Sequence, residues 1–183
     1  IILLASLLCF AHKATAGIFR SDIVIAGGGT SGVTAAVQAA RLGASVVVVE
    51  QTTWLGGMLT AAGVGAVDGN YNMPAGLWGE FRDSLAAHYG SLEALKTGWV
   101  SNVMFEPSVG NRIFHNMVAK EKGVTLWTES EVKAVSHNGN VWTVHVARPD
   151  GQTDVVEAKV LVDATELGDI AKMCGVPYDL GME

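Results

Sequence analysis

The chain has 183 residues, of which 49% are apolar and 16% charged; this balance predicts one globular domain with a sizeable core, not a disordered or fibrous chain. Its formal net charge is −6, which argues against nucleic acid and acidic membrane surfaces as partners, because both require clustered lysine and arginine. The 22 glycines indicate an unusual number of tight turns.

Residues 1–16 are interpreted as a signal peptide whose basic start is missing. The run IILLASLLCFA is shorter than the roughly 20 residues of a membrane-spanning helix, and Ala14-Thr15-Ala16 has the small-x-small pattern of a cleavage site before Gly17. A buried first strand or an uncleaved membrane anchor is the alternative. We therefore expect a secreted or periplasmic protein with no stable membrane anchor after cleavage.

The next elements predict an α/β fold with a Rossmann-like parallel sheet. DIVIA (22–26) has the pattern of a short buried strand, and SVVVVE (45–50) is too apolar to be half exposed. Between them, apolar residues recur at i, i+3, i+4 and i+7 from Val33, which predicts a helix that ends at Gly43. Continuous β-branched runs of this kind are typical of parallel sheets covered on both faces.

Downstream, the Gly-, Asn- and Trp-rich segment 51–106 is predicted to be an insertion with one helix near 75–89. The apolar pattern then predicts a helix over 108–122 capped by Gly123. The remaining predicted elements are a core strand at 124–128, an antiparallel β-meander of strands at 131–137, 141–147 and 153–158, a separate buried strand at 159–165 and a helix from Leu167.

The stretch IVIAGGGTSG contains a glycine motif with a physical purpose. Gly27, Gly29 and Gly32 fit G-x-G-x-x-G between a strand and a helix. The first glycine permits the sharp turn, the second lets a pyrophosphate touch the backbone, and the third lets helix and strand pack closely. The helix N-terminus, at Thr30 and Ser31, offers unpaired N–H groups to the phosphates.

Glu50 lies at the tip of the second strand, where a carboxylate can bind a ribose 2′-hydroxyl, and Gln51 follows it. A carboxylate there repels a 2′-phosphate, so NADP is disfavoured. The motif leaves NAD and FAD open, because both contain an ADP half.

Three further motifs carry a resemblance: WLGGML (54–59), FEPSVGNRIFHNMV and VLVDATELGDIAKMCGVPY. With them the chain resembles the FAD-dependent oxidoreductase family, within the flavoproteins that share a glutathione-reductase-like FAD-binding domain, and the DATE-x-GD form resembles secreted bacterial members. The resemblance implies FAD as cofactor and residues 17–183 as an FAD-binding domain, incomplete at its C-terminus. It also implies cofactor contacts from Gly56, Gly57, Met58, Val132, Ala164 and Asp169.

Two points of that resemblance are open. Many members have Gly where this chain has Glu166, so the chain departs from the family pattern in this loop. Asp169 is equally a helix N-terminal acid that complements the helix dipole.

Other residues give weaker signals. The chain has no cysteine pair after Gly56-Gly57, which excludes a dithiol reductase, and Cys174 is expected to pack among apolar neighbours. His115 and the other histidines are better explained as solvated or capping residues than as general bases, and none has metal-ligand spacing. The insertion aromatics could line a substrate pocket or form a small satellite core: Trp54, Tyr71, Trp78 and Trp99.

The predicted function is the N-terminal, cofactor-binding portion of an FAD-dependent oxidoreductase that transfers a hydride from a small-molecule substrate to flavin. The catalytic residues are expected outside these residues, so the chain alone is expected to be catalytically silent. The alternatives are an NAD-dependent dehydrogenase domain and a non-catalytic nucleotide-binding module.

Overall fold

A computed structural model describes residues 17–69 and 71–181. The predicted signal peptide, residues 1–16, lies outside the described residues.

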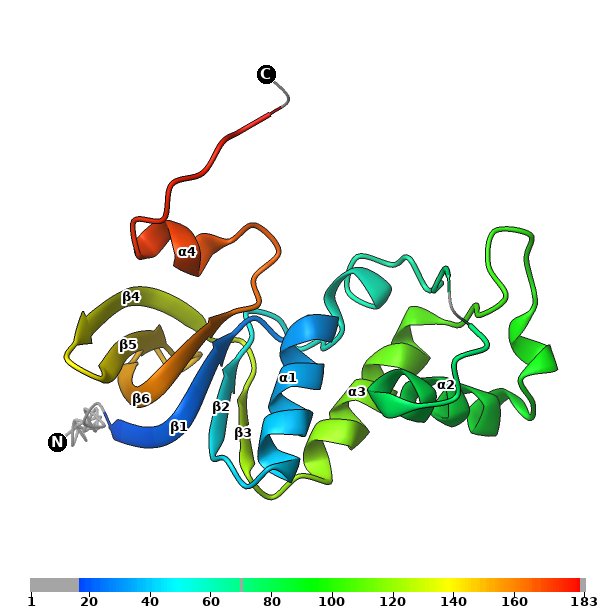
Figure 1. Cartoon of the computed structure of the whole chain (residues 1–183), viewed down its shortest axis with the longest axis horizontal. Coiled ribbons are helices and arrows are strands. Elements are labelled where there is room, and N and C mark those ends of the chain that lie inside the picture. The colour runs from blue at the N-terminus through cyan, green and yellow to red at the C-terminus, as the bar shows by residue number, and fades with distance from the viewer. Residues whose placement is uncertain (1–16, 70, 182–183) are drawn as a thin grey trace, which may run out of the picture.

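One six-stranded sheet organises the chain, with the strand order β3-β2-β1-β6-β5-β4 (Figure 1). The parallel part joins β3 to β2, β2 to β1 and β1 to β6, whereas β6–β5 and β5–β4 are antiparallel. The predicted combination of a parallel sheet and a β-meander is therefore confirmed. The strands are β1 (Ile18–Ala26), β2 (Val46–Val49), β3 (Val124–Trp127), β4 (Glu131–Asn138), β5 (Val141–Ala147) and β6 (Thr153–Asp163).

The described helices agree in number and order with the apolar patterns. They are α1 (Thr30–Arg41), α2 (Gly76–Tyr89), α3 (Pro107–Ala119) and the short α4 (Asp169–Met173), with 3-10 turns η1 (Gly57–Leu59) and η2 (Glu93–Leu95). The predicted cap at Gly123 is wrong, because α3 ends at Ala119 with Lys120 as its C-cap. The last helix begins at Asp169 and not at Leu167.

Two strand predictions also need correction. β1 begins at Ile18 and not at residue 22, because Arg20 lies opposite Glu157 of β6 and binds it at 2.9 Å. The strands predicted at 153–158 and 159–165 are one strand, β6. Its first half pairs with β1 on one side and β5 on the other, and its second half pairs with β1 alone.

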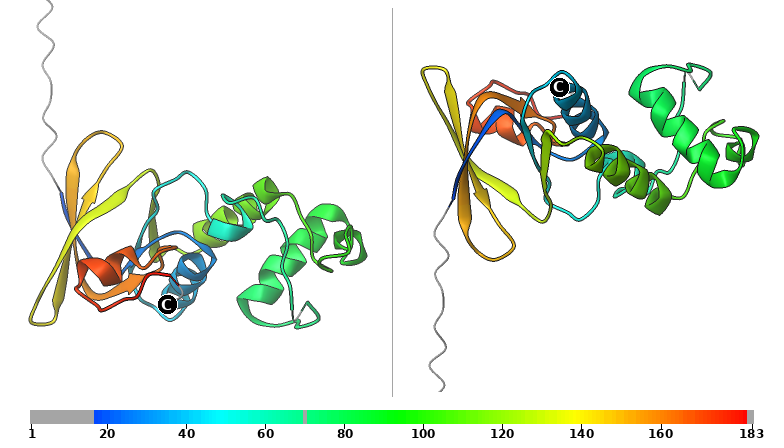
Figure 2. Two further views of the ribbon diagram at one scale, coloured as in Figure 1. Left: turned by 90° about the horizontal axis from the view of Figure 1, so that it is seen from above. Right: turned by 90° about the horizontal axis from the view of Figure 1, so that it is seen from below.

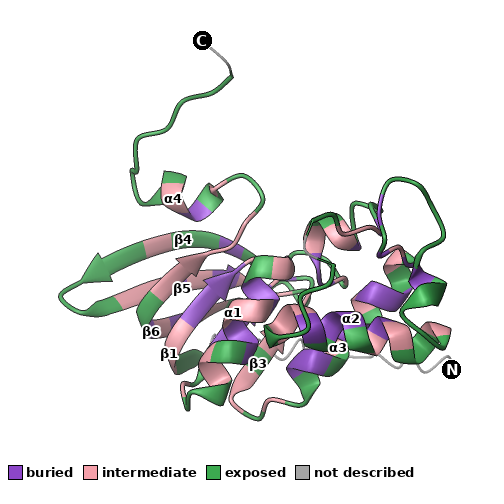
Figure 3. Ribbon diagram, turned by 45° about the vertical axis from the view of Figure 1, so that its right-hand side comes forward, coloured by how far each residue is buried: buried purple, intermediate pink, exposed green. Residues whose placement is uncertain are grey.

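The core lies on both faces of the parallel strands, because successive side chains of a strand point to opposite faces. Ile25 and Val48 pack with Ala36 of α1 on one face, whereas Val24 packs with Val144 of the meander on the other. All four residues of β2 are buried, as its unbroken valine run predicts. Buried positions follow the inner sides of α1, α3 and α2 as well (Figure 3).

The segment between β2 and α3 carries α2 and η2 away from the sheet. The β4–β5 hairpin and α2 lie at opposite ends of the molecule (Figure 2). Phe81 of α2 stacks on Phe114 of α3, with ring centroids 4.5 Å apart, and Leu85 and Leu95 are fully buried beside them. α2 is thus held on α3, and α3 in turn contacts α1.

Candidate functional site

Three parallel strands bring their carboxyl ends to the same edge of the sheet: Gly27 follows β1, Glu50 follows β2 and Ala164 follows β6. Ligands of open α/β sheets bind at this edge. A cavity of about 850 Å³ opens here, within the range of roughly 300–1,000 Å³ usual for ligand pockets.

The three motif glycines of the first turn lie in different environments. Gly27 has φ +103°, and an added Cβ would collide with the Ala164 carbonyl. Gly32 lies on the carbonyl of Gly27, so a side chain there would separate α1 from β1. Gly29 has φ −62° and faces the cavity, with its nearest neighbour for an added Cβ, Glu166 Oε1, at 3.4 Å.

The N-terminus of α1 adjoins Gly29. The first bond that enters the helix runs from Val33 N to Gly29 O at 2.9 Å, so the N–H groups of Thr30, Ser31 and Gly32 have no acceptor within the helix. Such groups, with the helix dipole, favour an anion.

A second glycine turn closes on the first. Gly56 N donates to Gly28 O at 2.9 Å, and the Thr30 hydroxyl donates to Gly56 O at 2.9 Å. Gly56 and Gly57 have φ of +108° and +53°, which side-chain-bearing residues rarely adopt. The two turns therefore form one bare backbone wall.

Glu50 hydrogen-bonds to both neighbouring loops. Its Oε2 accepts from Gly28 N at 2.7 Å, and its Oε1 accepts from the amide and hydroxyl of Thr52, both at 2.8 Å. Oε2 accepts only one of these bonds and keeps capacity for another, so the carboxylate can accept from a ribose hydroxyl.

Asp163 organises the far side of the cavity. Its Oδ1 accepts from the amide (3.0 Å) and hydroxyl (2.7 Å) of Thr165, and its Oδ2 accepts from Ala171 N at 2.8 Å. Burial by itself raises the pKa of Asp163, but these hydrogen bonds, with one from Ile170 N, outweigh it and leave the pKa below its ordinary value. The acid thereby fixes the loop that leads into α4.

The cavity collects most of the predicted site residues. Gly27, Gly29, Glu50, Gln51, Gly57, Met58, Val132, Ala164 and Asp169 line it. Thr30, Ser31, Gly32 and Gly56 are not among the residues that line it. That these residues bind FAD stays a prediction.

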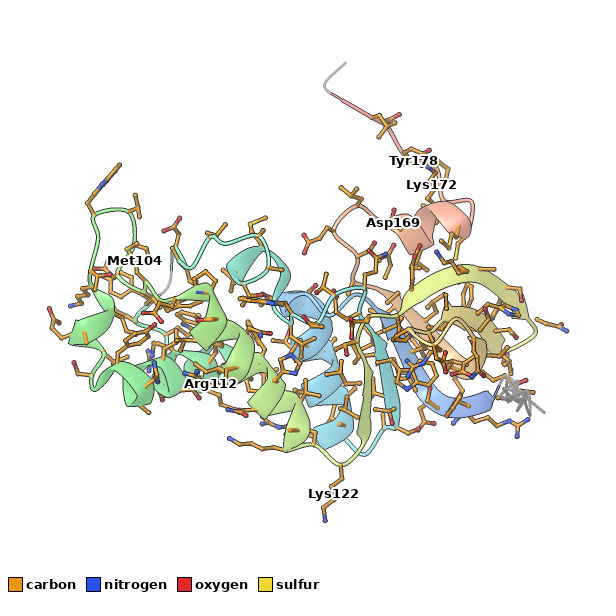
Figure 4. All side chains as sticks on the ribbon, turned by 180° about the vertical axis from the view of Figure 1, so that it is seen from behind. Met104, Arg112, Lys122, Asp169, Lys172 and Tyr178 are labelled. Carbon is orange, nitrogen blue, oxygen red and sulfur yellow. The ribbon has the colours of Figure 1, made fainter. Side chains whose placement is uncertain are left out.

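Sequence reasoning missed several residues of the lining. Asp163, which supports it, could have been suspected, because an acid at the end of a parallel strand can cap the next helix. Asp169 and Lys172 lie on α4 (Figure 4). The unpredicted polar lining residues are Thr52, Ser130, Glu131, Thr165, Glu166 and Lys172.

The donors and glycines of this cavity fit the ADP half of a dinucleotide. Bare backbone at Gly29 and Gly57 allows phosphates to approach, the first turn of α1 supplies N–H donors, and Glu50 supplies a ribose acceptor. The carboxylates Glu131, Glu166 and Asp169 also line the cavity, against the single cation Lys172 among its lining residues. The backbone amides must therefore provide much of the attraction for a diphosphate.

Comparison with known families decides between the dinucleotides. The model of the FAD dependent oxidoreductase family matches residues 22–183, which is most of the chain. The chain belongs to this family. Its cofactor is FAD, and the cavity is the candidate site for it.

Solved structures show the same fold. A flavoprotein/dehydrogenase from Cytophaga hutchinsonii has 19% identity and a TM-score of 0.66, over 88% of this chain and 44% of that one. The flavin-dependent monooxygenase PieE, solved with FAD and substrate, has 18% identity and a TM-score of 0.67, over 90% and 33%. L-proline dehydrogenase from P. horikoshii has 21% identity and a TM-score of 0.52, over 84% and 24%. The chain thus spans less than half the length of these structures.

The weaker sequence signals have mixed outcomes. Trp78 and Trp54 are partly buried, against the core and the cavity respectively, but Tyr71 and Trp99 are exposed, so a satellite core of all four aromatics is wrong. Cys174 is exposed and not packed as expected.

Over residues 17–69 and 71–181, no group of three acidic, Cys or His side chains could hold a metal ion. No helix in that same part of the chain is long and apolar enough to cross a membrane.

Proposed function

We infer that the protein containing this chain removes a hydride from a C–H bond of a small-molecule substrate, with FAD as the acceptor. The observation that carries the proposal is the joined pair of glycine turns, with α1 and Glu50 at the same cavity. When bound, FAD supplies the two-electron redox chemistry. The chain's own residues bind and orient: the first turn of α1 donates to phosphates, Glu50 accepts from ribose, and the apolar side chains of Met58 and Met173 line the cavity.

A C–H donor is favoured over a thiol donor by the composition of the second turn. The stretch GGMLTAAG has no cysteine, so this wall of the site offers no thiol for disulfide exchange. The A-x-A pattern before Gly17 further supports export of the protein to the periplasm or the medium.

The full-length protein is mixed with alcohols, amines or sugars in the absence of oxygen. Loss of the flavin absorbance then reports reduction of the flavin by the substrate. We expect bleaching by one substrate class without any nicotinamide cofactor. Bleaching only on addition of NADH or NADPH would overturn hydride transfer from substrate.

A further inference from the structure

We propose that Asn111 and His115 of α3 are positioning residues for FAD, because they clamp the turn at residues 53–57 that forms one wall of the cofactor cavity. Neither residue lines the cavity itself. The proposal rests on the FAD site described above.

Two hydrogen bonds make the clamp. Asn111 Oδ1 accepts from Leu55 N at 2.8 Å, and His115 Nε2 lies 3.1 Å from Thr53 O. Because the partner of His115 is a carbonyl oxygen, Nε2 must carry the proton and donate. The two side chains are four residues apart on α3 and so share one face of that helix.

The space between the clamp and the turn is closely filled. Phe114 lies on the same side of α3, and a Cβ added to Gly56 would come within 2.6 Å of its ring. Leu55 is fully buried, so its N–H would lose its described acceptor without gaining water if Asn111 were replaced by an apolar residue.

The clamped turn is bonded directly to the first glycine turn. Gly56 donates to Gly28 O and accepts from the Thr30 hydroxyl, and a Cβ at Gly57 would lie 3.2 Å from Gly29 Cα. A shift of residues 53–57 therefore changes the spacing of Gly29 and Gly57, two packed backbone positions of the wall against which the cofactor must lie. α3 acts on FAD through this spacing.

The test uses pairs of variants that remove or keep one hydrogen-bonding atom in the full-length protein. Asn111→Leu removes the side-chain oxygen that accepts from Leu55 N, whereas Asn111→Asp keeps an acceptor oxygen there. His115→Leu removes the N–H that donates to Thr53 O, whereas His115→Gln keeps a side-chain N–H donor. Asn116→Leu makes the same change at an exposed position of the same helix. The readouts are the FAD dissociation constant, from flavin fluorescence, and the melting temperature of the FAD-free protein.

We expect Asn111→Leu and His115→Leu to weaken FAD binding by about tenfold or more, and the Asp and Gln variants to stay within about threefold of wild type. Asn116→Leu should bind as wild type does. A buried α3 residue that does not share the helix face of Asn111 and His115, Ile113, separates positioning from general stability. Ile113→Val should lower the melting temperature without weakening FAD binding.

Equal FAD affinity in all variants would overturn the clamp and leave the FAD site intact. Weakening by Ile113→Val as large as that by His115→Leu would also overturn it, even if Asn111→Leu failed to fold. A wild-type protein that binds no FAD would overturn the proposed function together with the clamp.

Discussion

At the scale of single residues, Glu50 has two separable tasks. Its carboxylate bonds to Gly28 and Thr52, and its remaining capacity faces the cavity. Glu50→Ala should weaken FAD binding about ten- to a hundredfold, since a charge-assisted hydrogen bond is worth roughly 1.5–3 kcal/mol. Titration of the variant with FAD checks this, with Glu157→Ala, which removes a carboxylate of β6 that does not line the cavity, as control. Wild-type affinity in Glu50→Ala would mean that the ribose lies elsewhere.

The negative charge of Glu166 is expected to repel the phosphates of the cofactor. Its Oε1 lies beside the two glycine turns, at the place where phosphates must approach. Glu166→Gln keeps the shape and removes the charge, so FAD binding should strengthen by about two- to tenfold, more at low ionic strength. Titrations at two salt concentrations measure this, and Glu129→Gln, an exposed carboxylate nearby, should change nothing. Weaker binding in Glu166→Gln would make the carboxylate a cofactor ligand instead.

Asp163 gives the fold an acid-sensitive contact. Because folding lowers its pKa, it stabilises the folded state above its unfolded-state pKa of about 3.9, and this contribution is lost as pH falls through the lowered value. Asp163→Asn should therefore lower the urea midpoint clearly at neutral pH and much less in strong acid. Chemical unfolding of both proteins across pH 2–7 tests it. A difference independent of pH would contradict this role.

At the scale of elements, Arg41 of α1 joins three segments. It binds Glu80 of α2 with both terminal nitrogens, at 2.6 and 2.8 Å, and Glu121 after α3 at 2.8 Å. Arg41→Lys loses the planar fork, so it should destabilise by up to about 1 kcal/mol, limited by partial solvent exposure. Urea unfolding at low and high salt measures this loss. If Arg41→Lys were as stable as wild type at low salt, the two-nitrogen contact of Arg41 with Glu80 would not contribute to stability.

The elements also show where sequence patterns stop being informative. The valine run of β2 and the apolar face of α3 predicted these elements because burial alone determines them. β6 was predicted as two strands because its partners change midway, so its pattern turns from alternating to continuous. Residues 155–162 contain no Gly, Pro, Asn or Asp, although a residue of this kind usually marks the end of a strand. This absence indicates a single continuous strand.

At the scale of the whole molecule, the glycine motif predicted the near wall of the cavity, since its spacing is set by local backbone geometry. The contributions of Glu166, Lys172 and Met173 depend on where β6 brings the chain back, and no local pattern encodes that return. His115 illustrates the same limit: its sequence neighbours suggested a solvated residue, but tertiary packing brings it to Thr53 O.

We propose that FAD lies against the bare backbone of Gly29, and one variant tests this claim directly. Gly29 has a φ of −62° that alanine adopts freely, and an added Cβ would meet no protein atom closer than 3.4 Å. Gly29→Ala should therefore keep the melting temperature of the FAD-free protein within a few degrees. Its methyl group would occupy the space of the pyrophosphate, so we predict FAD affinity at least about a hundredfold below wild type. A Gly29→Ala protein that is folded and binds FAD as tightly as wild type would contradict the claim.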